Sequence, residues 1–211
     1  MNNNGNWSTT LWDDMQGFAY EETNNLIALN ENKILSVWLK EGQLYFGIIL
    51  PTYNSSEFKF YPGESALPNI VSFDIKKLNE NCLALITKDI YDEVRVRSVG
   101  VNGSTVNISC TAEENPNGSN AEPISLGVTT EECIKIIPIS SSRSMTLLPK
   151  EDRTLDIHFF YHDNTMVSEL SRDKENYITE VTVKNSFEGV LLSYYNVILI
   201  YNDKNGSSKF E

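Results

Sequence analysis

The chain has 211 residues, of which 17 are basic and 29 acidic, so its net charge is −12 at pH 7. A chain of this length forms one large or two small domains, and it buries enough surface to fold without disulfides. The acidic balance disfavours phosphate backbones and anionic membrane surfaces, so we expect no nucleic-acid partner. Its most apolar stretches, such as Val190–Ile200, fall far short of the ~20 apolar residues that a membrane helix needs, so we expect no insertion into a membrane.

The composition favours strands over helices. Val, Ile and Thr are abundant, Ala is scarce, and Asn is among the most frequent residues. β-branched side chains suit a pleated sheet, Ala suits a helix, and Asn is common in the turns between strands. We therefore predict an all-β fold of antiparallel strands, without a metal or cofactor.

The first unit along the chain is an N-terminal arm, Met1–Asp14. It carries Trp7, Leu11 and Trp12 in an otherwise polar stretch. Because aromatic anchors dominate the energetics of interfaces, we predict that these three residues bind a partner or dock on the arm's own domain. The arm has neither the basic nor the apolar region of a secretory signal, which predicts a protein made in the cytoplasm.

The remaining residues, 15–211, are predicted to form a domain of β-meanders. Its first meander has three apolar runs separated by two tight turns, followed by a fourth strand. Runs of this length between polar turns are typical of adjacent antiparallel strands. The four predicted strands are Leu26–Leu29, Ile34–Leu39, Leu44–Leu50 and Phe58–Tyr61.

A second meander repeats the first. The sequence Leu29–Asn32 returns letter for letter as Leu78–Asn81, 49 residues later. Strands are again predicted on either side of turns, and Asn102-Gly103 is the strongest hairpin signal in the chain. The predicted strands of this copy are Leu83–Ile86, Val94–Val99 and Thr105–Ser109.

Two weaker copies follow. Glu131–Ile137 aligns with Glu80–Ile86 at a register of 51 residues, and Glu188–Tyr194 resembles Asn32–Val37. The single candidate helix is Thr165–Glu175, in which Met166, Val167 and Leu170 are the apolar residues.

Periods of 40–50 residues with about four strands each are typical of a β-propeller, because one meander cannot bury both of its faces alone. The fold prediction is therefore a stack of four-stranded, propeller-like meanders. A β-sandwich made of two similar meanders is the alternative. The polar segment Thr111–Glu122 is the most loop-like stretch of the chain and could divide the domain.

The sequence contains no recognisable catalytic motif. The two histidines, His158 and His162, share one strand face with Asp156, or would form an i, i+4 metal-binding pair on a helix. Their aromatic and β-branched neighbours favour the strand. A Ser–His–acid triad lacks its glycine-rich elbow and a phosphate-binding loop is absent, so we expect no enzymatic activity and assign no catalytic residue.

Two binding alternatives concern the surface. The acidic segment Glu113–Glu122 could hold calcium, although it lacks the ligand spacing of an EF-hand. Aromatic side chains in or near turns could bind sugars, although such residues more often pack in a core. These aromatic candidates are Tyr20, Trp38, Tyr45, Tyr53 and Tyr91.

The repeat unit consists of Leu29–Asn32, then Ile34–Trp38, then Gly42–Leu50. Over Leu26–Ser109 it resembles the propeller-like repeats of bacteriophage tail, baseplate and fibre proteins and of phage-derived bacteriocin particles. The resemblance implies a non-enzymatic structural or attachment component of a phage-like particle, located in a virion and contacting other particle proteins or its own copies. The alternatives are a lectin-like module that binds carbohydrate or protein, with a cell-surface glycan as partner, and a hydrolase on a β scaffold.

Overall fold

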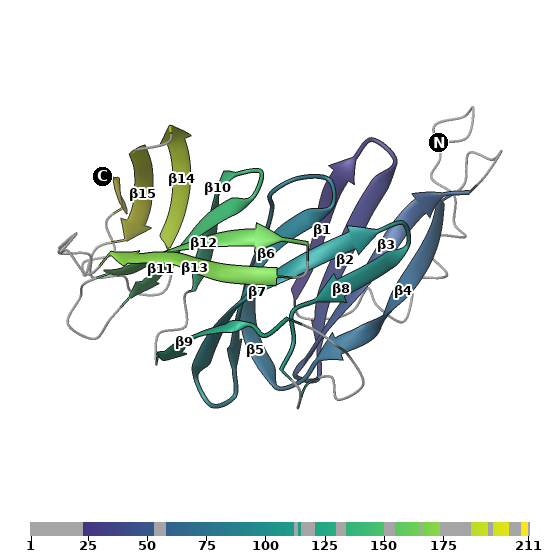
Figure 1. Ribbon diagram of the computed structural model, residues 1–211, viewed down its shortest axis with the longest axis horizontal. Coiled ribbons are helices and arrows are strands. Elements are labelled where there is room, and N and C mark those ends of the chain that lie inside the picture. The colour runs from purple at the N-terminus through teal and green to yellow at the C-terminus, as the bar shows by residue number, and fades with distance from the viewer. Residues whose placement is uncertain are drawn as a thin grey trace.

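The computed structural model describes residues 23–52, 58–111, 114, 121–129, 134–149, 155–164, 166–173, 187–193, 196–202 and 208–210. Every regular element in these ranges is a β-strand, as the composition predicts (Figure 1). In chain order the strands are β1 (Thr23–Asn30), β2 (Lys33–Lys40), β3 (Gln43–Pro51), β4 (Phe58–Leu67), β5 (Ile70–Lys77), β6 (Cys82–Asp89), β7 (Glu93–Asn102), β8 (Thr105–Ile108), β9 (Ile124–Val128), β10 (Lys135–Ser140), β11 (Arg143–Pro149), β12 (Leu155–Asp163), β13 (Met166–Asp173), β14 (Phe187–Ser193), β15 (Asn196–Asn202) and β16 (Ser208–Phe210).

The strands form antiparallel meanders, in which each strand pairs with the next one along the chain. In the described part of the chain the sheets have the orders β1-β2-β3-β4, β5-β6-β7-β8, β10-β11-β12-β13 and β14-β15-β16. β8 pairs with the second half of β7, and β9 pairs with its first half. The segment 111–122 therefore connects two strands that belong to one sheet.

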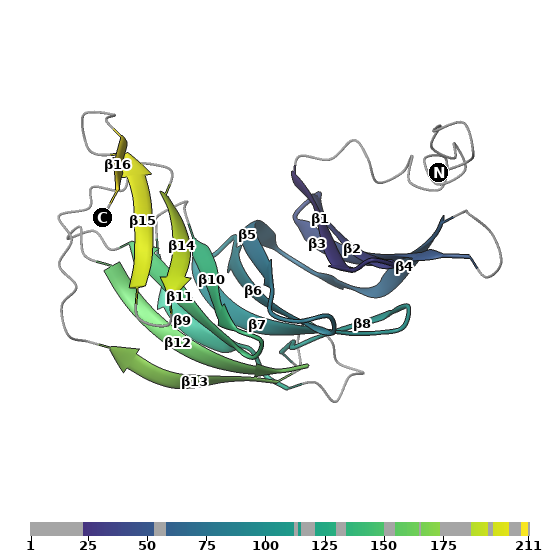
Figure 2. The same cartoon turned by 90° about the horizontal axis from the view of Figure 1, so that it is seen from above.

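The sheets lie side by side along an arc (Figure 2). Their first strands are neighbours, because β5 contacts both β1 and β10, and β10 also contacts β14. This serial stacking is propeller-like, and it differs from a sandwich, in which two sheets cover each other. The first and last of the described sheets stand apart, so the described strands do not close into a ring (Figure 2).

The repeated sequence marks a repeated turn. The backbone N–H of Asn32 donates to Oδ1 of Asn30 at 3.0 Å, and the N–H of Asn81 donates to Oδ1 of Asn79 at 2.9 Å. Such a side chain fixes the turn locally by accepting from the backbone two residues on. The predicted equivalence of the first two meanders is thereby confirmed.

The third sheet uses the same turn with a different residue. Here the N–H of Ser142 donates to Oγ of Ser140 at 3.3 Å, so Ser140 takes the place of Asn79. This turn joins β10 to β11, which makes β10 the first strand of its sheet. The predicted alignment of Glu131–Ile137 with the second strand of the earlier meander is therefore wrong by one strand.

The alignment of the fourth copy is wrong in the same way. The sequence pattern aligns Glu188–Tyr194 with a second strand, but β14 is the first strand of its sheet, and Ser193 pairs with Asn196 across the following turn. The pair Asn30 and Lys33 has the same geometry in the first sheet. Apolar runs of first and second strands look alike in sequence, and only the pairing distinguishes them.

The predicted helix over Thr165–Glu175 is also wrong. The segment contains β13, which pairs with β12 and has a bulge opposite Phe159 and Phe160. Val167 packs against the core, while Met166 and Leu170 are exposed. The pairing partner decides this conformation, because the segment has no strong local preference of its own.

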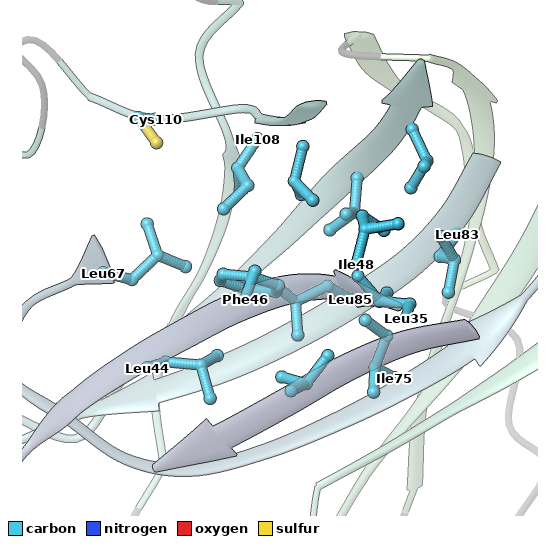
Figure 3. Packing of buried hydrophobic residues seen from close by; sticks show 14 of the residues in the cluster. Leu35, Leu44, Phe46, Ile48, Leu67, Ile75, Leu83, Leu85, Ile108 and Cys110 are labelled. Atoms are coloured by element: carbon cyan, nitrogen blue, oxygen red, sulfur yellow. The ribbon is translucent and has the colours of Figure 1, made fainter. Parts of the chain in front are cut away.

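Side chains that alternate along the strands divide the core into layers between the sheets. The largest layer fills the space between the first two sheets and includes Leu35, Phe46 and Leu83 (Figure 3). A second layer lies between the second and third sheets and includes Ile86 and Phe160. Each inner sheet therefore contributes both of its faces to the core, which explains why β6 is buried along its whole length.

A third cluster lies on the outer face of the first sheet. Its buried members are Trp38, Ile49 and Phe60, and Ile34 packs against them. The repeat predicts one or two adjacent cores for Ile34, Val37, Leu83 and Ile86. Among the described residues they are instead spread over the three clusters named above. The physical reason is that residues at equivalent positions face equivalent sides of different sheets.

Candidate functional site

The two histidines lie on one face of β12, as the strand interpretation predicts. Phe160 stands between them, with its ring centroid 6.2 Å from that of His158 and 6.4 Å from that of His162. This face is turned toward the second sheet, because Phe160 belongs to the layer between the two sheets. Among the described residues, no three His, Cys, Asp or Glu side chains gather closely enough to hold a metal ion.

His162 links the second and third sheets through two serines. Its Nδ1 lies 2.8 Å from Oγ of Ser98, and its Nε2 lies 2.7 Å from Oγ of Ser144. Ser98 donates its hydroxyl proton to the carbonyl of Met166, so its oxygen accepts from His162. This assigns the proton of the neutral imidazole to Nδ1, and Nε2 then accepts from Ser144.

This Ser–His contact has no route to a substrate. Ser98, Ser144 and His162 are all buried between the sheets. Burial also lowers the pKa of His162 to about 4, so the ring is neutral at physiological pH. The arrangement holds two sheets together, and no hydroxyl within it is accessible for nucleophilic attack in this conformation.

His162 makes folding sensitive to acid. Its pKa is about 4 in the folded protein against an ordinary value of 6.5, so the unfolded chain takes up the proton first. The stability contributed by the neutral ring is complete above about pH 6.5 and is lost as the pH falls toward 4, by roughly 3 kcal/mol in total. Urea unfolding of the wild type and of His162→Gln, each at pH 7 and pH 4, measures this loss of stability. Glutamine can hydrogen-bond to both serines but does not titrate. Equal pH dependence in the two proteins would refute this expectation.

Among the described residues, Arg97 is a fully buried charge, because its side chain has no exposed surface. Its guanidinium donates to both carboxylate oxygens of Glu114, at 2.6 and 2.8 Å, and also to the carbonyl of Ser109 at 2.9 Å. Nε of the same guanidinium donates to Thr87 at 3.2 Å. Burial by itself raises the pKa of Glu114, but the hydrogen bonds and charge of Arg97 outweigh it, and the net pKa is lowered.

The Arg97 contact also bears on the calcium alternative. Glu114 belongs to the acidic segment Glu113–Glu122, and both of its oxygens are taken by Arg97. The backbone N–H of Thr111 donates to the same carboxylate at 2.8 Å. A calcium ion in this segment would therefore have to bind without Glu114 or break a buried ion pair.

One end of the second sheet carries exposed apolar side chains, which we call the β6–β7 patch: Val71, Ile90, Tyr91 and Val128. Tyr91 is 73% exposed and Val128 is 72% exposed. The patch spans neighbouring strands. The backbone N–H of Ile90 donates to the carbonyl of Asn69, which directly precedes β5 and its residue Val71. On the other side β9 pairs with β7, which places Val128 opposite Glu93. Several large apolar side chains at one end of a sheet mark a surface suited to a partner.

The turn at the centre of the patch is rigidly held. Oδ1 of Asp89 accepts from the backbone N–H groups of Tyr91 and Glu93, at 2.9 and 3.0 Å. Oδ2 of Asp89 pairs with Arg95 at 3.0 Å, and Lys88 pairs with Asp92 at 2.7 Å. Ile90 and Tyr91 thus sit on a turn held by hydrogen bonds and ion pairs, and Val71 and Val128 flank it on β5 and β9.

The repeated turns lie in a row at the other end of the sheets, away from the β6–β7 patch. Nδ2 of Asn30 lies 3.5 Å from Oε2 of Glu80, and Nδ2 of Asn79 donates to the carbonyl of Ser141 at 2.6 Å. Each turn thereby contacts the turn of the next sheet. A shallow cleft of about 690 Å³ lies between the first two turns, lined by Leu29, Asn30, Glu31, Asn32, Lys33, Leu50, Pro51, Lys77 and Glu80.

The residues predicted from sequence are only partly placed together. Trp7, Leu11 and Trp12, like Tyr20 and Tyr53, lie outside the described residues. Of the remaining aromatic candidates for sugar binding, Trp38 is buried, Tyr45 is half-buried and Tyr91 is exposed in the β6–β7 patch. Sequence reasoning missed the other members of that patch, because their apolar side chains suggest core residues rather than surface ones.

These observations define an all-β protein built of serially stacked antiparallel meanders, with apolar layers between its sheets, buried polar contacts at His162 and Arg97, and an apolar patch outside. No family model matches the chain, and no curated protein matches it. Among solved structures it is similar to an uncharacterized protein of Listeria monocytogenes EGD-e, with 12% identity and a TM-score of 0.47. The match covers 92% of this chain and 51% of that one, so the chain spans about half of the other protein's length. In the described ranges, no helix is long and apolar enough to span a membrane.

Proposed function

We propose that this protein is a non-enzymatic interaction module that serves as a structural or attachment component of a larger assembly. The observation that carries the proposal is the β6–β7 patch. Its apolar side chains are exposed on the turn between β6 and β7 and on the adjoining strands β5 and β9, whereas the nucleophilic and imidazole groups between the second and third sheets are buried. A surface of this kind favours binding to a macromolecule over chemistry on a small substrate.

A protein partner fits the patch best. An exposed tyrosine and three aliphatic side chains form its centre, and the carboxylates of Asp92 and Glu93, whose side chains are 45% and 29% exposed, lie beside it. Interfaces commonly have an apolar centre with aromatic anchors and a polar rim. The partner is either another protein of the assembly or a further copy of this chain.

A phage-like tail or baseplate particle is the narrower form of this proposal, and it rests on the sequence resemblance alone. Under that form the partners are the sheath, tube or baseplate proteins of the particle. Their genes would be neighbours of the gene for this chain. Co-expression with those neighbours, followed by co-purification, tests the narrower form directly.

The patch gives a mutational test of the proposal. The double variant Tyr91→Ser, Val128→Ser is expected to weaken association with the partner by 100-fold or more, because truncating central interface anchors has the largest cost. Its fold should be unchanged, since both side chains project into solvent. Light scattering across a concentration series detects self-association, and co-purification detects other partners.

The matched control is Tyr161→Ser, which removes an exposed tyrosine from β12 outside the patch. It should leave association unchanged. Wild-type protein that stays monomeric at every concentration, and that co-purifies with none of the neighbouring gene products, contradicts the proposal. If the double variant and the control lose equal affinity for the partner, the β6–β7 patch is not the binding surface.

A glycan-binding module is the second candidate, and Tyr91 is the observation that favours it. Its ring is the most exposed aromatic ring among the described residues that were predicted to bind sugars, and exposed aromatic rings stack on sugars. A glycan array separates the two candidates. Saturable binding of one glycan class, lost in Tyr91→Ala, favours the glycan, and an empty array favours the protein partner.

A further inference from the structure

The outer face of the first sheet has the character of a surface between two sheets. Trp38 stacks on Tyr45 with ring centroids 5.5 Å apart and planes 11° apart, and its ring lies 5.9 Å from that of Phe60. Gly47 makes room for Phe60, because a Cβ at that position would lie 2.3 Å from the Phe60 ring. Ile49 completes the cluster.

Comparison with the second sheet shows which side of the first sheet this face corresponds to. Counting from the polar turn residue, Ile34 of the first sheet corresponds to Leu83 of the second. Leu83 packs against the preceding sheet, in the layer between the first two sheets. Ile34 is turned to the same side of its own sheet, which is the side where a preceding sheet would lie.

The face is buried although no described strand covers it. Trp38 is 2% exposed, Ile49 4% and Phe60 7%. The described strands with the main contacts to the first sheet are β5 and β8, and both lie across the layer on its other face. The described strands therefore leave the outer face without a partner sheet.

We propose that the N-terminal segment, residues 1–22, occupies this outer face in the place of a preceding sheet. The segment leads directly into β1, which is an edge strand of the first sheet. Leu26 of β1 pairs with Ser36, lies on the outer side and is 64% exposed, so the chain enters at the margin of this face. A second copy of the chain is the competing occupant.

The N-terminal segment is long enough and apolar enough to cover the outer face of the first sheet. Twenty-two residues reach roughly 70 Å when extended, whereas four paired strands are only about 15–20 Å wide, so the segment can cross the face more than once. Trp7, Leu11, Trp12 and Phe18 supply large apolar groups in a polar stretch. This assigns the predicted anchors of the arm to the chain's own first sheet, and it goes beyond the proposed partner-binding role of the β6–β7 patch.

Fluorescence of Trp38 tests the proposal. The chain has three tryptophans, so Trp7→Phe with Trp12→Phe leaves Trp38 as the only indole. Deleting residues 1–22 from this background is expected to raise acrylamide quenching of Trp38 at least threefold and to shift its emission to the red. A peptide of residues 1–22 with the same two Phe substitutions should reverse both changes saturably. The same peptide with Ser at positions 7, 11 and 12 should not.

A second measurement keeps the test decisive if the deletion variant fails to fold. A benzophenone photo-crosslinker is placed at position 12 of the full-length chain, and the products are mapped by mass spectrometry. Intramolecular crosslinks to β2, β3 or β4 support the proposal. Crosslinks to other sheets, crosslinks between two chains, or equal shielding of Trp38 in a folded, monomeric deletion variant would overturn it.

Discussion

Replacing Glu114 with alanine is expected to lower the free energy of unfolding by about 3–5 kcal/mol. The change leaves the guanidinium of Arg97 charged and fully buried, with only a carbonyl and a hydroxyl as acceptors. A guanidinium is not deprotonated in proteins, so the buried charge remains. Urea unfolding followed by tryptophan fluorescence measures the loss.

A double variant separates the cost of an orphaned charge from the loss of side-chain contacts. Arg97→Met combined with Glu114→Leu removes both charges and keeps much of the buried volume. Because well-packed apolar residues replace buried ion pairs at little cost, the double variant should recover most of the stability that Glu114→Ala loses. If the double variant is less stable than Glu114→Ala, the attraction within the ion pair contributes more to stability than the desolvation of its charges costs.

Leu35→Asp is expected to cost more than about 4 kcal/mol, which is a large share of the stability of an ordinary domain. Leu35 is fully buried in the layer between the first two sheets, whose buried members are apolar side chains and Cys110. The new group must either carry an unpaired charge or be protonated, and both states are unfavourable. Ile86→Asp, in the layer between the second and third sheets, should have a similar effect.

The control for Leu35→Asp is Ala28→Asp. Ala28 lies on the neighbouring strand of the same sheet and is exposed, so the substitution should cost less than about 1 kcal/mol. Thermal unfolding by circular dichroism compares the two variants. Similar losses from both would mean that the layer between the sheets is not a closed core.

The local features of this chain were predictable because their causes are local. Asn30 and Asn79 fix their turns through their own side chains, and Asn102-Gly103 supplies the positive φ that its hairpin needs, with Gly103 at +61°. Turns of this kind bound the strands on either side. The first two meanders and their equivalence therefore follow from the letters of the sequence.

The later meanders were misread because their signals are not local. Ser140 replaces Asn in the third turn, so the repeat is present in the hydrogen bond but not in the letters. The segment of β13 has no strong preference, and its pairing with β12 makes it a strand. Runs of apolar residues also cannot reveal which strand of a meander they form.

The burial of Arg97 is a feature that the sequence pattern did not predict. In a strand of alternating Val and Arg, an isolated reading places the arginines on a solvated face. The second sheet has a neighbour on each side, so both faces of β7 are covered, and Arg97 is buried with a carboxylate that lies 17 positions further along the chain. The Asn102-Gly103 hairpin turns the chain back toward Arg97, but the burial of the ion pair depends on the sheets packed on either side, which no local pattern encodes.

The sequence by itself determined that this protein is made of strands, where its first turns lie and which two meanders repeat. The tertiary structure decided which face of each sheet meets which neighbour, and with it the fate of single side chains. Trp38 and Tyr91 illustrate the division, because both are aromatic residues predicted to lie in or near strands and turns. One is buried on the outer face of the first sheet, and the other is exposed at the end of the second. Burial depends on what packs against a residue from elsewhere in the chain, whereas the tendency to form a strand or a turn depends on the residue and its nearest neighbours.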